Sequence, residues 1–190
     1  MLKSKKHTKT KNKKIVQINK KKKPKILIKV GLLGDAFVGK TTLMAKYARN
    51  KFDQDYIQSL GGHYEFVNML PLVCNEAQAI LYMFDLTRRS TLRSVKSWYR
   101  QSKGLNNNSI SILVGTKYDL FCRLPYDEQK EIVKVSRRYA MKMNAPLIFC
   151  SSKYKINISI IFKIIISKLV EVPVKIKPIS KFTEPIREGY

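Results

Sequence analysis

The stretch ILIKVGLLGDAFVGKT, residues 26–41, decides the fold. Its first eight residues are rich in β-branched side chains and nearly all apolar, which predicts a buried parallel strand. Residues 34–41 then match the pattern G-x-x-x-x-G-K-[ST] and open a helical pattern. In such a unit the glycines let backbone N–H groups turn toward phosphate oxygens, and the helix N-terminus adds its positive dipole end. The stretch therefore predicts a phosphate-binding loop.

The loop supplies the first group of candidate site residues. We expect Lys40 to reach the β- and γ-phosphates of a nucleotide and the Thr41 hydroxyl to bind Mg²⁺. The alternative is an ordinary glycine turn between a strand and a helix, but it does not explain a Lys-Thr pair directly after the second glycine. The phosphate-binding candidates are Gly34, Asp35, Ala36, Phe37, Val38, Gly39, Lys40, Thr41 and Thr42.

Strand and helix patterns alternate along the rest of the chain. Apolar runs at residues 79–85, 109–115 and 146–150 predict further buried strands. Apolar residues at helical spacing follow Lys40 and recur between the runs and after the last one, where length and spacing outweigh a high β-branched content. This alternation predicts an α/β fold, with a parallel sheet and helices on both of its faces.

Two polar motifs follow the ends of predicted strands: TKYD at residues 116–119 and CSSK at residues 150–153. Open α/β sheets bind ligands at the carboxyl ends of their strands. The Asp119 carboxylate can accept both N–H donors on the edge of guanine, a pair that adenine does not offer. Taken alone, CSSK favours a helix cap instead. The guanine-binding candidates are Thr116, Lys117, Asp119, Ser151, Ser152 and Lys153.

The three motifs together have the order and spacing of a Ras-like small GTPase, and the resemblance covers roughly residues 26–170. YEFVNMLPLVC, AILYMFDLTRRSTLRSVKSWYRQ and GTKYDLF resemble the fungal septum-promoting GTPases, and so does the C-terminal EPIREGY. The resemblance implies a P-loop NTPase fold that binds GTP or GDP with Mg²⁺ and hydrolyses GTP slowly, as a switch for septation and mitotic exit. It also implies GTPase-activating and exchange proteins, an effector protein kinase, and a cytoplasmic location at the spindle pole.

The resemblance breaks inside IQSLGGHYEFVNML, residues 57–70. In Ras-like proteins a loop ending in Thr-x-Gly, two strands and Asp-x-x-Gly-Gln follow one another. Here Ser59 takes the place of the Mg²⁺-binding threonine, His63 takes the place of the water-orienting glutamine, and the aspartate has no counterpart. No residues separate Gly61 from Gly62, whereas a hairpin needs about 5–6 residues per strand.

We therefore expect a Ras-like sheet truncated by two strands, with its first strand at an exposed edge and with impaired Mg²⁺ binding and hydrolysis. For His63, a solvent-exposed loop histidine is the alternative to a catalytic role. A second hypothesis for the protein is a catalytically degenerate module that binds guanine nucleotide or only a protein partner. Leu60-Gly61 could belong to either the first or the second loop, so a skipped or mispredicted exon, or a deletion between short repeats, would also explain the junction. Sequencing the transcript tests that explanation.

Charge is concentrated at the N-terminus. The chain has 190 residues and a net charge of +25, and its first 25 residues hold twelve lysines and no acid. We expect a disordered polybasic tail at residues 1–24, a GTPase domain at 25–172 and a C-terminal extension at 173–190. The tail could contact nucleic acid or an anionic membrane surface, which gives a third functional hypothesis, or it could be a solvated appendage.

The cysteines and the apolar segments indicate which redox compartment and which kind of membrane attachment to expect. Cys74, Cys122 and Cys150 are odd in number and lack metal-binding spacing, which suits buried or free thiols in a reducing cytosol. We expect neither a membrane span nor a prenyl anchor, because the longest apolar run is interrupted by lysines and no terminal cysteine is present.

Overall fold

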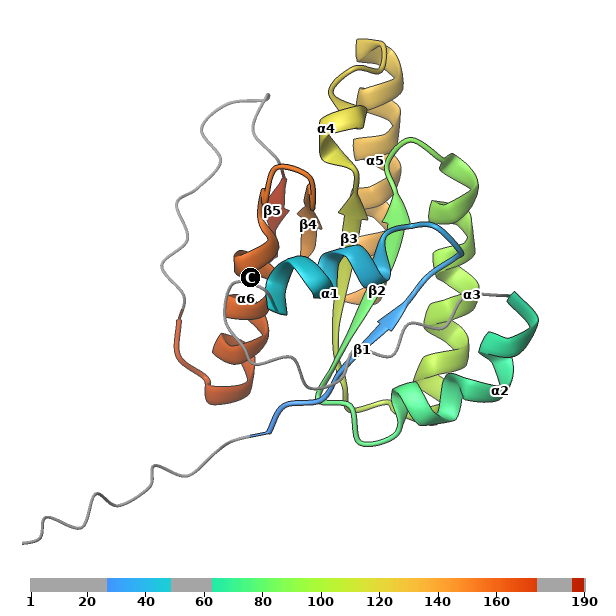
Figure 1. Ribbon diagram of the computed structural model, residues 1–190, viewed down its shortest axis with the longest axis vertical. Helices are drawn as coiled ribbons and strands as arrows, with labels where there is room; N and C mark the ends of the chain where they lie inside the picture. Colours follow the sequence, from blue (N-terminus) through green and yellow to red (C-terminus); the bar gives the residue numbers. More distant parts are fainter. Residues whose placement is uncertain (1–26, 49–62, 174–185, 190) are drawn as a thin grey trace, which may run out of the picture.

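The computed structural model describes residues 27–48, 63–173 and 186–189. Four parallel strands lie in the order β1-β2-β3-β4, and a short fifth strand, β5, pairs antiparallel with β4. Figure 1 shows this sheet with the helices arranged around it. The strands are β1 (Val30–Leu33), β2 (Ala79–Asp85), β3 (Ile110–Thr116), β4 (Leu147–Phe149) and β5 (Arg187–Glu188).

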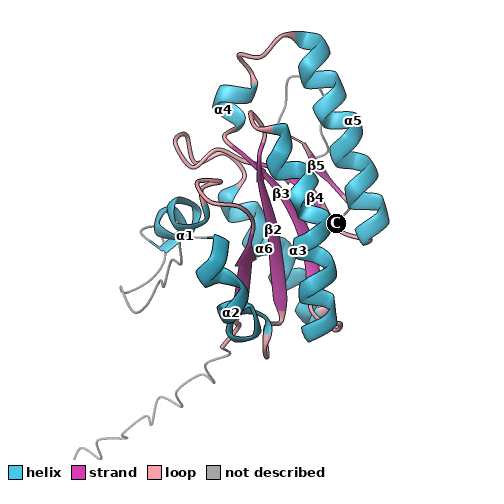
Figure 2. Cartoon of the chain, turned by 90° about the vertical axis from the view of Figure 1, so that its right-hand side faces the viewer, coloured by secondary structure: helices cyan, strands magenta, loops and turns pink. Residues whose placement is uncertain are grey.

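Helices cover both faces of the sheet, and Figure 2 shows the strands enclosed between them. One apolar cluster joins one face of the sheet to α1 and α6, and a second joins the other face to α2, α3 and α5. The α/β fold with a parallel sheet is thus confirmed. The helices are α1 (Lys40–Ala48), α2 (His63–Cys74), α3 (Arg89–Leu105), α4 (Tyr118–Phe121), α5 (Tyr126–Met143) and α6 (Ile158–Val170).

The core follows from the apolar patterns of the sequence. Every residue of β2 is buried, as expected for a central parallel strand that is covered on both faces. The predicted helix after the last strand is confirmed as α6, which packs on α1 through Tyr47 and Phe162. Their ring centroids lie 3.6 Å apart and their planes are inclined by 17°. The elements that carry the polar motifs are therefore held by apolar clusters on both faces of the sheet.

The two edges of the sheet differ. Within the described residues, β1 pairs with β2 alone and forms one edge, as expected. The predicted loss of two strands falls on residues 49–62, which lie outside the described ranges, and stays a prediction. The polybasic tail also lies outside them. At the other edge β4 receives β5, a pairing that the sequence did not predict.

Residues 62–71 align with the second mobile loop of Ras-like proteins, but a loop is wrong for the described part of this stretch, since α2 begins at His63. Pro71 lies inside this helix, and prolines usually interrupt helices. The helical pattern nevertheless continues past it, since the Asn75 N–H donates to the Pro71 carbonyl at 2.8 Å. Leu70 and Cys74, one turn apart, are buried against the sheet. The Lys29 ammonium donates to the carbonyl oxygens of Leu72 and Asn75 at the end of the helix.

None of the helices in the described ranges is long and apolar enough to cross a membrane. All three cysteines are free; Cys74 and Cys150 are buried, whereas Cys122 is exposed.

Candidate functional site at the carboxyl ends of the strands

The predicted phosphate loop, residues 34–39, connects β1 to α1 and curls tightly. Gly34 and Gly39 have φ angles of 152° and 95°, and Phe37 has a φ of 61°. A Cβ at Gly34 would lie 2.2 Å from the carbonyl oxygen of Met83, so the loop passes directly against β2. These positive φ values turn successive peptide groups in different directions, which is how a backbone forms a concave anion-binding surface.

Lys40 places its charge on this loop. Its ammonium donates to the carbonyl oxygens of Gly34 and Asp35, both at 2.8 Å. Burial lowers the pKa of Lys40, and the Asp35 carboxylate acts in the opposite direction. Thr41 and Thr42 occupy the next positions at the start of α1 and are exposed. The loop therefore brings a lysine ammonium, two hydroxyls and a helix N-terminus together, a combination that suits a polyphosphate.

Three contacts from distant parts of the chain hold the loop in place. The Thr116 hydroxyl at the end of β3 donates to the carbonyl oxygen of Val38 at 2.7 Å. The Trp98 indole N–H on α3 donates to the Asp35 carboxylate at 2.8 Å, and the Arg88 guanidinium donates to the Ala36 carbonyl at 2.9 Å. Thr116 is thus placed to support the phosphate loop. The sequence did not indicate Trp98 or Arg88 as site residues.

We expect Trp98→Phe to lower the free energy of unfolding by about 1–2 kcal/mol, because it removes the bond to Asp35 and keeps an aromatic ring in the core. Denaturant unfolding measures this change. Asp35→Asn is the matched control, since its amide oxygen still accepts from the indole and should cost less. Equal stabilities of Trp98→Phe and the unmodified protein would contradict the assignment.

The TKYD and CSSK motifs come together at the ends of β3 and β4. The Ser151 hydroxyl donates to the Asp119 carboxylate at 2.6 Å, and the Tyr118 N–H donates to the Cys150 carbonyl at 3.0 Å. Lys117 adopts the left-handed conformation, with a φ of 58°, as the chain leaves β3. The two motifs, 32 residues apart in the chain, therefore form one polar surface beside the phosphate loop.

Asp85 organises this surface, and the sequence analysis missed it. Its side chain is 1% exposed and lies 2.7 Å from the Lys117 ammonium and 2.9 Å from the Arg88 guanidinium. Burial alone would raise the pKa of Asp85, but hydrogen bonds from Lys117, Thr87 and Arg88 outweigh it and lower the pKa. The ionised carboxylate fixes the stem of Lys117. Its position as the only acid of AILYMFD, at the end of a buried strand, was the available signal.

The remaining predicted site residues are Ser152, Lys153, Ser59 and His63. Ser152 is half-buried, and the exposed Lys153 places its ammonium 5.3 Å from the centre of the Tyr154 ring. Ser59 lies outside the described residues, and so does the side chain of His63, although His63 is the first residue of α2. The catalytic and metal predictions at these two positions therefore stay predictions.

The described residues offer few side-chain ligands for Mg²⁺. Within them, no group of three or more His, Cys, Asp or Glu side chains could hold a metal ion. The carboxylates nearest the loop are engaged, Asp35 by Trp98 and Asp85 by its cationic partners. Thr41 is the one predicted protein ligand in the described ranges, so any Mg²⁺ would depend largely on nucleotide phosphates and water, as this ion often does.

A phosphate loop after β1 and a polar surface suited to guanine after β3 and β4 define the nucleotide-binding half of a small GTP-binding protein. The Ras family model matches residues 29–65 and 60–171, and the chain belongs to this family. The two matched segments share residues 60–65, as expected if this stretch resembles two separate places in the family pattern.

The names of individual relatives agree with the family assignment. The chain is 44% identical over 190 residues to Septum-promoting GTP-binding protein 1 of Schizosaccharomyces pombe, covering 88% of this chain and 96% of the relative. It is 25% identical over 160 residues to the Ras-like GTP-binding protein RhoL of Drosophila melanogaster, covering 72% and 83%. It is 24% identical over 169 residues to the Ras-related protein SEC4 of Saccharomyces cerevisiae, covering 76% and 75%. The predicted resemblance to septum-promoting GTPases is confirmed.

Proposed function

We propose that the protein is a GTP- and GDP-binding switch with slow GTP hydrolysis that acts in septation signalling. The observation that carries the proposal is the hydrogen bond from Ser151 to Asp119 at 2.6 Å, on a surface tied to the phosphate loop through Thr116. The relative with 44% identity is named for septum promotion, which supports the signalling context.

Each motif has a defined role in this proposal. Asp119 accepts the two N–H donors of guanine, and Lys117, fixed by Asp85, packs its stem over the base. Ser151, Ser152 and Lys153 close the other side of the base. The backbone of residues 34–39 and the Lys40 ammonium bind the phosphates, while Thr41 would hold Mg²⁺, which neutralises charge on the phosphates when it is bound.

A second candidate function is a guanine-nucleotide-binding module without catalysis. The junction at residues 57–70 lacks a counterpart of the aspartate that assists hydrolysis and has His63 in place of the glutamine, and this favours slow or absent turnover. Single-turnover GTP hydrolysis separates the two functions. A rate indistinguishable from that of GTP in buffer would reject the enzyme and retain the module.

We expect Lys40→Ala to weaken GDP binding about 10- to 100-fold, because it removes a charge-assisted contact to phosphate. Titration with a fluorescent GDP analogue, with and without Mg²⁺, measures the effect. Lys46→Ala, on the last turn of the same helix, is the control and should bind like the unmodified protein. Absence of GDP binding by the unmodified protein at micromolar concentration would reject the proposed function.

Ras-family proteins work with GTPase-activating proteins, exchange proteins and effectors. We further propose that the effector is a protein kinase, that the protein is cytoplasmic and acts at the spindle pole, and that residues 1–24 contact anionic surfaces. The resemblance to septum-promoting GTPases implies the kinase effector and the location. The twelve lysines of the first 25 residues support the contact with anionic surfaces. A tagged protein that stays diffuse through mitosis would contradict the location, and unchanged localisation without residues 1–24 would contradict the surface contact.

A further inference from the structure

The C-terminal residues 186–189 return to the sheet at the edge opposite β1 (Figure 1). The Phe149 N–H donates to the Ile186 carbonyl at 2.8 Å, and β5 then pairs antiparallel with β4, Ile148 opposite Arg187 and Leu147 opposite Glu188. Ile186 is buried among the apolar residues on the α3 and α5 side of the sheet. These residues belong to the EPIREGY stretch, to which neither phosphate nor guanine binding assigns a role.

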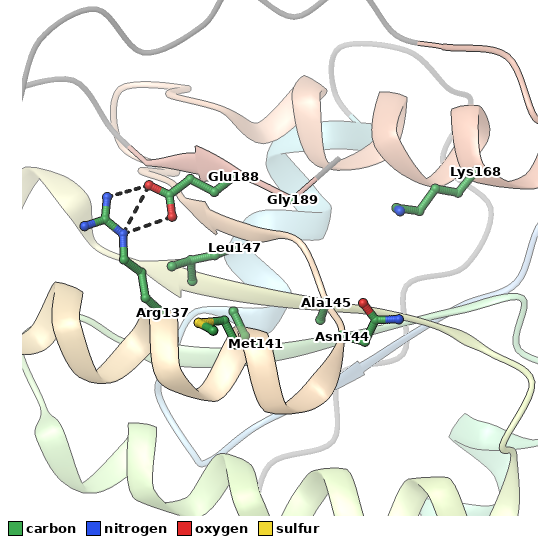
Figure 3. A pocket seen from close by; sticks show the side chains of 9 residues that line it. Arg137, Met141, Asn144, Ala145, Leu147, Lys168, Glu188 and Gly189 are labelled. Carbon is green, nitrogen blue, oxygen red and sulfur yellow. Dashed lines mark hydrogen bonds and ion pairs between the residues drawn. The ribbon is translucent and has the colours of Figure 1, made fainter.

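A side-chain contact secures this short strand. Figure 3 shows the Arg137 guanidinium of α5 facing the Glu188 carboxylate, with Nε 3.0 Å from Oε2 and a terminal nitrogen 2.5 Å from Oε1. This is the two-point geometry that gives Arg–carboxylate pairs their strength and direction. Two residues of strand are too few to stay paired by backbone bonds alone. The buried Ile186 and the ion pair, whose side chains are 50% and 38% exposed, therefore add to the backbone bonds that hold β5 on β4.

Among the described residues, the remaining surroundings of β5 are open on one side. A cavity of about 390 Å³ lies beside it, lined by residues that include Met141, Asn144, Lys168 and Glu188. In Figure 3 Lys168 on α6 lies well away from the Arg137–Glu188 pair. On this side the strand is held by its contact to Arg137 and not by close packing against α6.

The strand that receives β5 leads directly into the guanine surface. β4 ends at Phe149, two residues before Ser151, whose hydroxyl donates to Asp119. The Phe149 carbonyl accepts from the Asn157 side chain at 2.8 Å, at the other end of the loop that carries CSSK. β4 lies between β3 and β5, so a shift of β4 against β3 would move Ser151 relative to Asp119, which follows β3.

We propose that docking of the C-terminal strand on β4 positions Ser151 and Asp119 for guanine, with Arg137 and Glu188 as the positioning residues. The inference rests on the proposed guanine site and adds a second, distant determinant of its selectivity. Because coupling between two sites is reciprocal, bound guanine also stabilises the docked strand. A partner that captured residues 186–189 would then weaken guanine binding.

The test compares GDP with inosine diphosphate, which lacks the exocyclic amino group that Asp119 would accept from. We expect Arg137→Glu in the full chain to lower the ratio of GDP to inosine diphosphate affinity about 5- to 10-fold, the lower range of known couplings. Glu188→Gln should give a smaller change in the same direction. The double variant Arg137→Glu with Glu188→Arg restores the ion pair and should recover the ratio. Arg138→Glu makes the same charge change at an exposed neighbouring position and should leave the ratio unchanged.

The affinity ratio distinguishes positioning from a general loss of stability, which thermal unfolding monitors in parallel. A variant that melts earlier but keeps the GDP preference would overturn the inference, as would a double variant that does not recover it. If the unmodified protein binds GDP and Arg137→Glu keeps its selectivity, the positioning role alone is rejected. If the unmodified protein binds no GDP, the proposed function falls, and the inference falls with it.

Discussion

Gly34→Ala is expected to lower the melting temperature by about 10 °C, because a Cβ at this position would lie 2.2 Å from the Met83 carbonyl oxygen. The added methyl group meets backbone of β2, which cannot move without disturbing the centre of the sheet. Overpacking of about 1–3 kcal/mol and backbone strain of a similar size combine at this position, where φ is 152°. Thermal unfolding followed by circular dichroism measures the change.

Gly104→Ala is the matched control for this experiment. Gly104 lies in α3, and a Cβ there would meet nothing within 4 Å. Because alanine is the better helix former, this variant should be as stable as the unmodified protein or more stable by up to about 1 kcal/mol. Equal melting temperatures of Gly34→Ala and Gly104→Ala would contradict the close approach of the loop to β2.

Asp119→Asn is expected to weaken GDP binding at least about 100-fold. The change keeps the size of the side chain and an oxygen for Ser151, but it replaces one acceptor of guanine with an amide N–H donor. Hydrogen bonds to a charged group contribute about 1.5–3 kcal/mol each, and about 1.4 kcal/mol corresponds to a tenfold change in affinity. Competition between GDP and the fluorescent analogue measures the loss.

The control variant is Asp127→Asn, at an exposed position in the first turn of α5. It removes the same charge at a position outside both polar motifs and should bind GDP like the unmodified protein. Unchanged GDP affinity of Asp119→Asn would show that guanine is recognised elsewhere, even if the phosphate loop works as proposed.

The parts of the fold that the sequence predicted are those in which local pattern and burial agree. Residues 79–85 are wholly apolar up to Asp85, and β2 has the predicted bounds. The other parallel strands were placed within a few residues, since a buried run does not show where its backbone pairing starts. The last helix, α6, was recognised through its spacing although its β-branched content favours strands.

The elements that escaped prediction depend on contacts between distant residues. β5 has two residues and exists through Phe149, Ile186 and the Arg137–Glu188 pair, which no local pattern reveals. α2 contains Pro71, a local signal against the helix.

The site shows the same division. Its motif residues were found from their spacing, whereas Asp85, Arg88 and the indole N–H of Trp98 act across the folded chain. The hydrogen bond between Asp35 and Trp98, for example, joins residues that are 63 positions apart in the chain.

The attachment of α2 has a mechanical consequence. Lys29, just before β1, holds the carbonyl oxygens of Leu72 and Asn75 at the end of this helix, while Leu70 and Cys74 anchor the same end in the core. A displacement of the whole helix would also displace the segment that leads into β1 and the phosphate loop. Any rearrangement of α2 between nucleotide states is therefore expected to be a pivot about its last turn, with the amplitude increasing toward His63.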